Sequence, residues 1–434
     1  MRNKIIAKLH DKNFLLIFMS LLLFTAVIIT KHMGLNIFSD DEIRYNRHFD
    51  GLFDIIKYYW NFNGRMTTDV LAELLVHHFA LWIFIDCSVY LAVLFLIAKL
   101  LELHEWYLIW MEEILILMFP FSYWESAGFV STTTNYLYPL VALLLVMLTI
   151  KNIILTKHTN ILSVVTVFLG ITYLGFSEQY VVVCIIFLGY AIFHMISNIA
   201  SGINVSSVCT LLLMTCYTLA LFCAMYFSPG HQLRMSAAAT TTDWLPQFAD
   251  WTFQQKALEG FTTTVANVIF YDNEITIALC VALAILAIKS SRPVVAKFIG
   301  ILPLLGLLCI RIVGANRFII FYPYSYSLPD IDYSSFGEYA LLGFTASAVI
   351  VIAIFAAIIL LAENPNQKVF LFLILFAGAV SREIMGFSAT IYASSFRTFT
   401  LFLFLMIIAF LDIMKSLKNS YNPQALLLIL LLLL

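Results

Sequence analysis

The sequence predicts an all-α integral membrane protein with about 12 or 13 transmembrane helices and no soluble domain. Of its 434 residues, 62% are hydrophobic and only 12% are charged, and the mean hydropathy is +0.94. Soluble globular proteins are typically about 45–50% apolar and about 25% charged. The apolar residues also gather in runs that approach the roughly 20 residues needed for one helical crossing of a bilayer. Composition and run length together therefore predict a multi-pass protein of the cell membrane.

The first predicted transmembrane helix covers residues 13–30 and follows a basic N-terminal stretch. No small-x-small cleavage site follows it, so we expect a retained helix and not a cleaved signal peptide. The run at 113–124 is interrupted by Pro120, which predicts a broken helix because proline removes a backbone donor. The remaining apolar runs lie at 79–101, 135–156, 160–176, 179–199, 205–227, 274–288, 296–313, 339–361, 368–381 and 396–414, and a final short run begins near residue 424.

The two predicted sides of the membrane differ in the type of basic residue. Connections on the N-terminal side are short and carry mainly lysine, for example Lys151, Lys157 and Lys289. The positive-inside rule, counted on short loops, places that side and the N-terminus in the cytoplasm. Arginine prevails on the other side, and its planar fork suits phosphate and carboxylate. The arginines of that extracytoplasmic side are Arg44, Arg47, Arg65, Arg234, Arg311, Arg317, Arg382 and Arg397.

Long polar segments are also predicted on the extracytoplasmic side. We interpret 1–434 as a single polytopic domain, with a first extracytoplasmic loop at 31–69 and a large one at 228–273. Functional residues concentrate on loops held by a rigid scaffold. The sequence has no glycine-rich nucleotide-binding loop, which argues against a cytoplasmic nucleotide-sugar or ATP site. No nucleic-acid partner is expected.

The segment after the first helix reads Ser39-Asp40-Asp41-Glu42-Ile43-Arg44 and carries three consecutive carboxylates. A hydrated start of a loop is the plain interpretation. Ionisable groups at a membrane span nevertheless mark function more often than fold. A carboxylate beside a bound hydroxyl can act as a general base when that hydroxyl attacks a carbon centre. The segment therefore predicts an active site with Asp41 or Asp40 as the base and Glu42 and Arg44 beside it.

This arrangement resembles the GT-C type membrane glycosyltransferases. The resemblance rests on a cytoplasmic N-terminus, a first helix, and an outer loop that opens with the acidic motif Asp40-Asp41-Glu42. It implies a GT-C-like fold, an inverting transfer, and a polyprenyl-phosphate-linked sugar as donor. It also implies that Asp41 or Asp40 supplies the catalytic base. The sequence lacks the large C-terminal soluble domain of the members that transfer oligosaccharide to protein, which argues against transfer onto protein sequons.

Four arginines are candidates for binding the donor phosphate, which becomes the leaving group. Arg65 follows Gly64, and Arg234 follows the turn Ser228-Pro229-Gly230-His231, which adds His231 to the candidate site. Arg382 and Arg397 flank an outer segment rich in serine and tyrosine. Arginines aimed at a developing phosphate charge would stabilise it in a partly dry site. A structural ion pair is the alternative for each of them.

Two further carboxylates are predicted to bind the sugar. Glu125 lies in Tyr123-Trp124-Glu125 and Glu178 in Phe176-Ser177-Glu178-Gln179-Tyr180, so both have aromatic neighbours. Carboxylates can bind sugar hydroxyls while aromatic rings pack against the CH face. An interfacial belt of Trp and Tyr is the competing interpretation.

No metal site is predicted. The cysteines show no CxxC pair or Cys/His ligand spacing. A hard cation such as Mg²⁺ or Mn²⁺ on Asp40 and Asp41 is left open, since it favours carboxylate oxygens. No other cofactor is expected.

The leading functional hypothesis is a glycosyltransferase that moves a sugar from a polyprenyl-phosphate donor to a hydroxyl of a cell-envelope glycan or glycolipid. A surface-polysaccharide polymerase or ligase, and a lipid-linked oligosaccharide flippase or transporter, are the alternatives. The expected partners are the donor, the glycan acceptor, the lipid bilayer, a flippase and a donor synthase, because such a donor is made inside and used outside.

Overall fold

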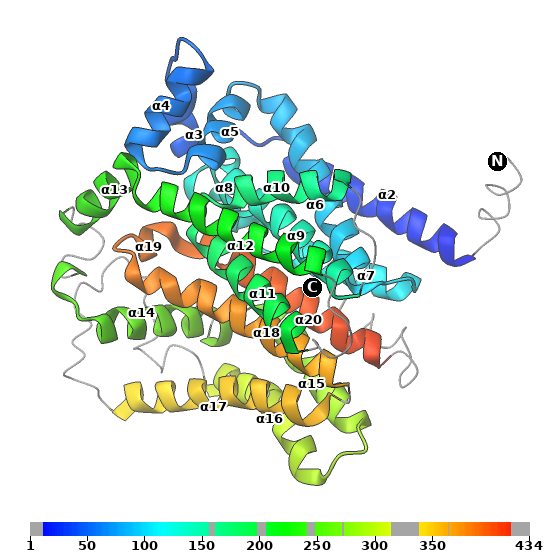
Figure 1. The fold of residues 1–434 in the computed structure, drawn as a ribbon. Coiled ribbons are helices and arrows are strands. Elements are labelled where there is room, and N and C mark those ends of the chain that lie inside the picture. Colours follow the sequence, from blue (N-terminus) through cyan, green and yellow to red (C-terminus); the bar gives the residue numbers. More distant parts are fainter. Residues whose placement is uncertain are drawn as a thin grey trace, which may run out of the picture. The chain divides into compact units, whose positions relative to one another are not determined.

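The computed structural model describes residues 12–155, 161–197, 205–240, 248–270, 273–313, 338–362 and 364–417. Within these ranges the chain is helical and contains no strand (Figure 1). The chain forms two compact units. Unit 1 comprises residues 1–113 and 121–237, and unit 2 comprises 114–120 and 238–434.

Unit 1 contains helices of two lengths. Its long apolar helices alternate with short helices formed by the polar segments. In chain order they are α2 (Lys12–His32), α3 (Asp40–Tyr45), α4 (Leu52–Phe62), α5 (Met66–Val76), α6 (Phe79–Leu101), most of α7 (Trp106–Met118), the 3₁₀ helix η1 (Phe121–Ala127), α8 (Phe129–Tyr136), α9 (Tyr138–Ile154), α10 (Ile161–Leu174), α11 (Glu178–Ser197), α12 (Val205–Tyr226) and most of α13 (Pro229–Thr240).

The core of unit 1 is built around α9. This helix packs against α6, α10 and α11, while α2 packs on α6 and α12 on α11. About 72% of the span formed by α8 and α9 is buried, against 17% for α2. A helix that is apolar on all sides belongs inside a protein or a membrane. The buried α9 therefore forms the core of unit 1, whereas most of α2 lies outside that core.

Unit 2 is organised around α20 (Thr400–Ser416), which packs against α15 and α18, while α16 packs against α15 and α17. About 83% of the span that contains α20 is buried. The other elements of unit 2 are η3 (Phe248–Asp250), α14 (Phe253–Val265), the π-helical turn η4 (Ala266–Phe270), α15 (Glu274–Lys289), α16 (Val294–Val313), α17 (Glu338–Leu361), α18 (Pro365–Glu383), η7 (Ile384–Phe387), α19 (Ile391–Ser394) and η8 (Ser395–Phe399).

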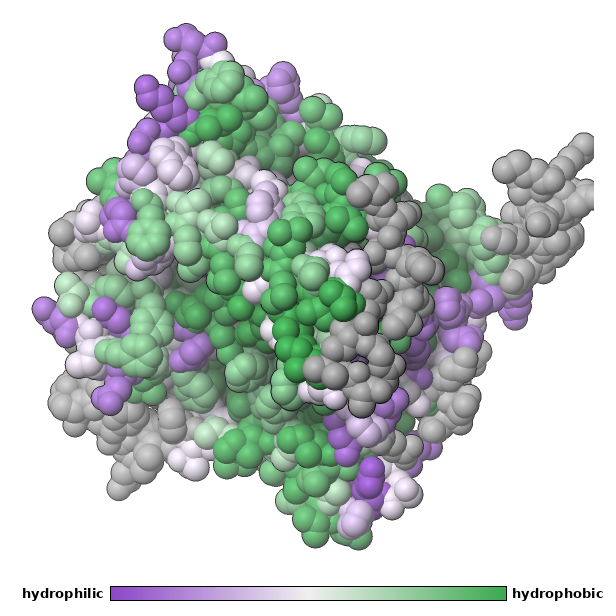
Figure 2. All heavy atoms as spheres, in the orientation of Figure 1, coloured by the Kyte–Doolittle hydropathy of each residue, from purple (hydrophilic) through white to green (hydrophobic). Residues whose placement is uncertain are grey.

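The described residues confirm a multi-pass, all-α membrane protein. They contain eight helices long and apolar enough to cross a bilayer, or nine if the bent pair formed by 253–270 and 274–289 is one span. Large apolar side chains point outward from these helices, with Leu23 67% exposed and Phe84 72% exposed. Hydrophobic residues cover much of the face shown in Figure 2. Water would penalise such a surface, whereas lipid solvates it.

The number of spans in the described residues is below the predicted 12 or 13. The run expected at 113–124 does not form one crossing, because α7 ends at Met118 and a 3₁₀ helix follows Pro120. The residue before a proline is biased away from helix, which explains the break. The apolar helix at 162–174 is shorter than a full crossing. The predicted final run from residue 424 lies outside the described residues.

The segments predicted as long loops are mostly helical. Residues 31–69 contain α3, α4 and the start of α5, and the described part of 228–273 contains α13, η3, α14 and η4. We call residues 40–76, which span α3 to α5, the helical cap (Figure 1).

Candidate functional site

The helical cap packs on one end of the unit 1 bundle. Its α5 helix contacts α6, α8 and α10, and α3 contacts α8. The Thr67 hydroxyl donates to the Tyr173 carbonyl at 3.0 Å, which fixes the cap on the last turn of α10. The helical cap, which the sequence assigns to the extracytoplasmic side, thus packs on the helices of unit 1.

Asp41 is completely buried and holds the first turn of α8. Its Oδ2 accepts the amide hydrogen of Val130 at 2.8 Å, and its Oδ1 accepts that of Ser131 at 2.8 Å. The first amides of a helix have no partner within the helix, so a carboxylate there satisfies donors and complements the dipole. Burial raises the pKa of Asp41, while the hydrogen bonds from residues 130 and 131 oppose that rise.

Gly128 makes this contact possible. It has a φ of +86°, and a Cβ atom added to it would lie 2.4 Å from Cγ of Asp41. Glycine adopts this left-handed conformation without strain and leaves room for the carboxylate. Both oxygens of Asp41 are therefore engaged in a backbone contact that a side chain at position 128 would obstruct.

The neighbouring acids have a different environment. Asp40 and Glu42 lie in the first turn of α3 and are exposed. Glu125 is also exposed, in η1 directly before the turn at Gly128. Of the two residues predicted as the base, Asp40 is the one whose carboxylate faces solvent.

Arg44 is buried in a network that joins the three helices of the cap. Its Nη2 donates to Oδ1 of Asp69 at 2.6 Å, and its Nη1 donates to the Tyr59 hydroxyl. The same hydroxyl donates to Oε2 of Glu73 at 2.5 Å. The Nε of Arg44 donates to the Ser131 hydroxyl at 2.9 Å, which connects the network to α8. Arg44 is therefore surrounded by protein partners.

Asp69 is the acceptor at the centre of this network. It accepts hydrogen bonds from Asn135 at 3.1 Å and from Asn63, in addition to the one from Arg44. Burial opposes its ionisation, but the guanidinium groups of Arg44 and Arg65 outweigh burial and lower the pKa of Asp69. An ionised Asp69 is thus stabilised by the cations around it.

A second charged cluster lies where α5, α11 and α13 meet. We call Arg65, Glu178, His231 and Arg234 the arginine cluster. Arg65 Nη2 donates to Glu178 Oε2 at 3.0 Å, and Arg234 Nη2 donates to Glu178 Oε1 and lies 3.2 Å from His231 Nδ1. Burial and the Arg234 guanidinium lower the pKa of His231, which favours a neutral ring. Two arginines therefore share a single carboxylate.

The arginine cluster remains accessible. The side chains of Arg65 and Arg234 are 26% and 31% exposed. Close packing brings together the segments that carry these two arginines. A Cβ added to Gly64 would lie 2.3 Å from the Ser228 hydroxyl, and one added to Gly230 would lie 2.5 Å from the backbone nitrogen of Asn63. Arginines that share one carboxylate and are partly exposed can bind an anion by charge-assisted hydrogen bonds.

The remaining candidate arginines belong to unit 2. Arg382 is fully buried, with its guanidinium 3.9 Å from the centre of the Phe399 ring and its Nη1 donating to the Thr398 hydroxyl at 2.6 Å. Arg397 is half-buried in η8, and its carbonyl accepts from the Thr400 hydroxyl at 2.7 Å. These contacts stay within unit 2, whereas the arginine cluster belongs to unit 1.

Sequence reasoning missed the pair formed by His32 of α2 and Asp86 of α6. Nε2 of His32 lies 2.9 Å from Oδ2 of Asp86, and both side chains are almost completely buried. The ring Nδ1 lies 2.7 Å from the Ile28 carbonyl. The available signal was the single acid inside the apolar run 79–101, because ionisable residues within spans are rare. Asp69 and Glu73 were also missed, since one turn of helix separates them and they look like an ordinary polar face.

Within the described ranges, no group of three or more His, Cys, Asp or Glu side chains is arranged to hold a metal ion. No family model matches the chain, and neither a curated protein nor a solved structure is significantly similar to it.

Proposed function

We propose that this protein is a membrane glycosyltransferase. It would transfer a sugar from a polyprenyl-phosphate-linked donor to a hydroxyl of a cell-envelope glycan or glycolipid on the extracytoplasmic face. The observation that carries the proposal is the combination, at one end of unit 1, of an exposed acid in the helical cap and a partly exposed arginine cluster. Both lie on a scaffold of apolar helices suited to a lipid-linked substrate.

The charge of the arginine cluster suits a phosphate leaving group. Arg65 and Arg234 contribute two positive charges, while Glu178 contributes one negative charge. The excess positive charge is available to a phosphate oxygen. Charge that develops on a leaving phosphate is stabilised best by donors that are already in place, and Glu178 fixes both guanidinium groups before the substrate binds.

The exposed carboxylate of Asp40 acts on the acceptor. In the proposed reaction Asp40 takes the proton of the acceptor hydroxyl as its oxygen forms a bond to the anomeric carbon. The bond between that carbon and the phosphate oxygen breaks, and polyprenyl phosphate leaves with the electron pair. Asp41 positions α3 through its contact with α8. Its carboxylate is buried, so the proton transfer is assigned to the exposed Asp40.

The test uses the purified full chain in lipid nanodiscs with a labelled polyprenyl-phosphate sugar and an envelope glycan extract. Release of polyprenyl phosphate and transfer of label to glycan are both measured. We expect Asp40→Asn to lower turnover by roughly 10²-fold or more, the usual contribution of a general base. Arg65→Ala and Arg234→Ala should each lower donor use.

Arg292→Ala provides the matched control. Arg292 lies in the short connection between α15 and α16 and has no ion pair with the described residues. This control should keep full turnover. Absence of release with every sugar donor supplied, from a protein that is folded and binds donor, would refute the glycosyltransferase assignment.

A transporter of lipid-linked sugars is the second candidate, because buried ionisable residues within membrane-spanning helices often mark a proton or substrate pathway. The His32–Asp86 pair is the specific observation that favours it. The two candidates predict different effects of Asp86→Asn. In a transporter, Asp86→Asn should abolish movement of a fluorescent lipid-linked sugar across the membrane of proteoliposomes. In a transferase, the substitution that damages turnover should instead be Asp40→Asn.

A further inference from the structure

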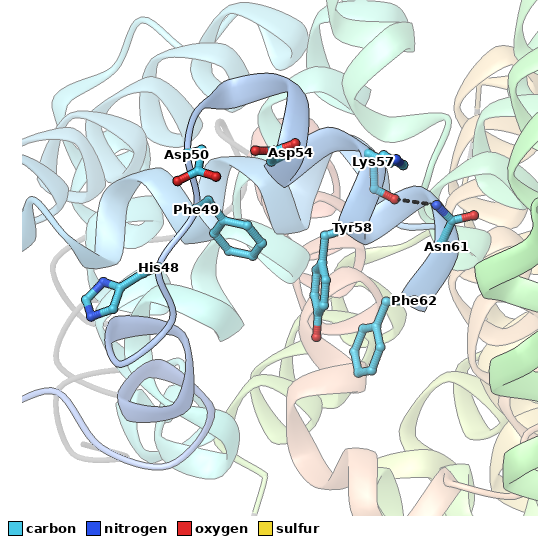
Figure 3. A pocket seen from close by; sticks show the side chains of 8 residues that line it. All are labelled: His48, Phe49, Asp50, Asp54, Lys57, Tyr58, Asn61 and Phe62. Atoms are coloured by element: carbon cyan, nitrogen blue, oxygen red, sulfur yellow. Dashed lines mark hydrogen bonds between the residues drawn. The ribbon is translucent and has the colours of Figure 1, made fainter.

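A surface pocket lies between α4 and the turn that precedes it (Figure 3). Its lining residues are His48, Phe49, Asp50, Asp54, Lys57, Tyr58, Asn61 and Phe62, and its volume is about 490 Å³. Residues 54, 57, 58 and 61 follow the i, i+3, i+4, i+7 spacing that places side chains on one face of a helix. Ile55 and Tyr59 occupy the buried face of the same helix. One face of α4 is therefore buried in the protein, and the other face presents polar and aromatic groups to the pocket.

The carboxylates in the pocket are available to a ligand. Asp50 and Asp54 form no ion pair or side-chain hydrogen bond with the described residues. Asn61 Nδ2 donates to the Lys57 carbonyl at 2.8 Å, which orients the amide and leaves its Oδ1 as an acceptor. The pocket thus offers carboxylate and amide acceptors together with the ammonium donor of Lys57. Such a mixture suits a ligand with several hydroxyl groups.

Aromatic rings form the other wall. The rings of Phe49 and Tyr58 are 5.4 Å apart at 62°, and those of Tyr58 and Phe62 are 5.1 Å apart at 19°. The Arg47 guanidinium lies 5.0 Å from the centre of the Tyr58 ring and donates to the Tyr59 hydroxyl at 3.2 Å. This contact anchors the wall to the buried network of the cap. The rings are therefore held in place before a ligand arrives.

From this lining we propose that the pocket binds a pyranose unit that is neutral or carries an amino group. The CH face of the ring packs on Tyr58 or Phe62, and the hydroxyls bind Asp50, Asp54 and Asn61. The volume lies within the range of roughly 300–1,000 Å³ usual for small-molecule sites. Two carboxylates oppose one lysine, so a uronic acid is disfavoured by repulsion. The ammonium group of an amino sugar would form an ion pair with Asp50 or Asp54.

The position of the pocket assigns it to the acceptor. Asn61 and Phe62 lead directly into Asn63, Gly64 and Arg65 of the arginine cluster. A Cβ added to Gly230 would lie 2.7 Å from the Phe62 amide, so the start of α13 touches the end of the pocket. A glycan held here lies next to the cluster that would hold the donor phosphate. This assignment as acceptor subsite rests on the proposed function, whereas pyranose binding does not.

Binding is measured by saturation-transfer NMR and calorimetry on the full chain in detergent, without any donor. The probes are oligosaccharides of glucose, glucosamine and galacturonic acid. We expect the first two to bind and the third to bind at least tenfold more weakly. Tyr58→Ala and Asp54→Asn should each weaken binding about tenfold or more, a loss of about 1.4 kcal/mol.

Phe53→Ala is the matched control on the same helix. Phe53 is 87% exposed and does not line the pocket, so the substitution should leave sugar affinity unchanged. Failure of all three oligosaccharides to bind the unmodified chain would overturn the proposal. Equal affinity for the galacturonate probe, or unchanged affinity in Tyr58→Ala and Asp54→Asn, would overturn it as well.

The two proposals can fail separately. If pocket variants lose sugar binding while no polyprenyl phosphate is released from any donor, the pocket is supported and the glycosyltransferase is not. If transfer occurs and the pocket variants bind and turn over like the unmodified chain, the glycosyltransferase is supported and the pocket is not. Arg65→Ala should impair donor use and leave oligosaccharide binding intact.

Discussion

Replacing Asp41 with alanine should destabilise unit 1 far more than any change at the exposed Asp40. The substitution removes both hydrogen bonds from the carboxylate to the amides of Val130 and Ser131, each 2.8 Å long. A hydrogen bond to a charged group contributes roughly 1.5–3 kcal/mol. Two such bonds at a buried site give an expected loss of about 3 kcal/mol or more in the free energy of unfolding. Alanine cannot satisfy either amide, and burial limits replacement by water.

The assay is equilibrium unfolding in mixed micelles, followed by tryptophan fluorescence. Trp124 is a suitable probe because it is fully buried in η1, close in sequence to the capped turn, and donates to the Tyr90 hydroxyl at 2.8 Å. Asp40→Ala is the matched control, and it should change stability by no more than about 0.5 kcal/mol. Asp41→Asn keeps one acceptor oxygen but turns an NH₂ group toward an amide, so we expect a loss of about 1–3 kcal/mol.

Two results would refute this reasoning. Equal losses in Asp41→Ala and Asp40→Ala would show that the carboxylate does not hold α8. Full stability of Asp41→Asn together with complete loss of glycosyl transfer would make Asp41 the base, and the assignment of that role to Asp40 would then be wrong. The experiment therefore separates a structural role from a catalytic one at adjacent residues.

Three further predictions concern the same end of unit 1. Arg44→Met should cost about 3–5 kcal/mol in unfolding free energy, because it removes the guanidinium that donates directly to the buried Asp69 carboxylate. Adding Asp69→Asn should recover part of that loss, and no recovery would contradict the pairing. Folding lowers the pKa of Asp69, so this carboxylate contributes fully to the free energy of unfolding above its ordinary pKa of about 4. That contribution is lost as the pH falls toward the pKa of the folded state. Unfolding midpoints measured against pH should show the loss, and Asp69→Asn should reduce it. Gly128→Ala should cost about 1–3 kcal/mol because its φ is positive and its Cβ would meet Asp41; an unchanged unfolding curve would exclude the close contact.

Composition is enough to predict the helical membrane fold. Apolar runs of this length are stable in lipid only when their backbone polar groups are hydrogen-bonded internally, as they are in a helix. The number of spans depends on details that hydropathy does not resolve. Residues 113–124 look like a crossing in a hydropathy profile, yet Pro120 ends the helix two residues earlier. The polar segment after α2 also looks like a loop, whereas its apolar residues at helical spacing form α4 and bury Ile55 and Tyr59.

The candidate site was partly predictable for a related reason. Charge type and sidedness single out Arg65, Glu178 and Arg234, and the structure joins them in one cluster. Sequence alone could not distinguish Asp40 from Asp41, because the difference arises from packing against α8, some 90 residues away. The binding role predicted for Arg44 stays a prediction, and the buried partners found for it are equally invisible to composition.

Charge balance within unit 1 indicates where an anionic substrate would bind. Around Arg44 the nearby cations and anions are matched, since Arg44 and Arg47 face the carboxylates of Asp69 and Glu73. An added phosphate there would have to displace a buried carboxylate that already holds the cap together. The arginine cluster has two guanidinium groups on one carboxylate and keeps both partly exposed. A phosphate therefore gains the most favourable electrostatic energy at the arginine cluster. This cluster lies directly after the end of α4, the helix that lines the proposed sugar pocket.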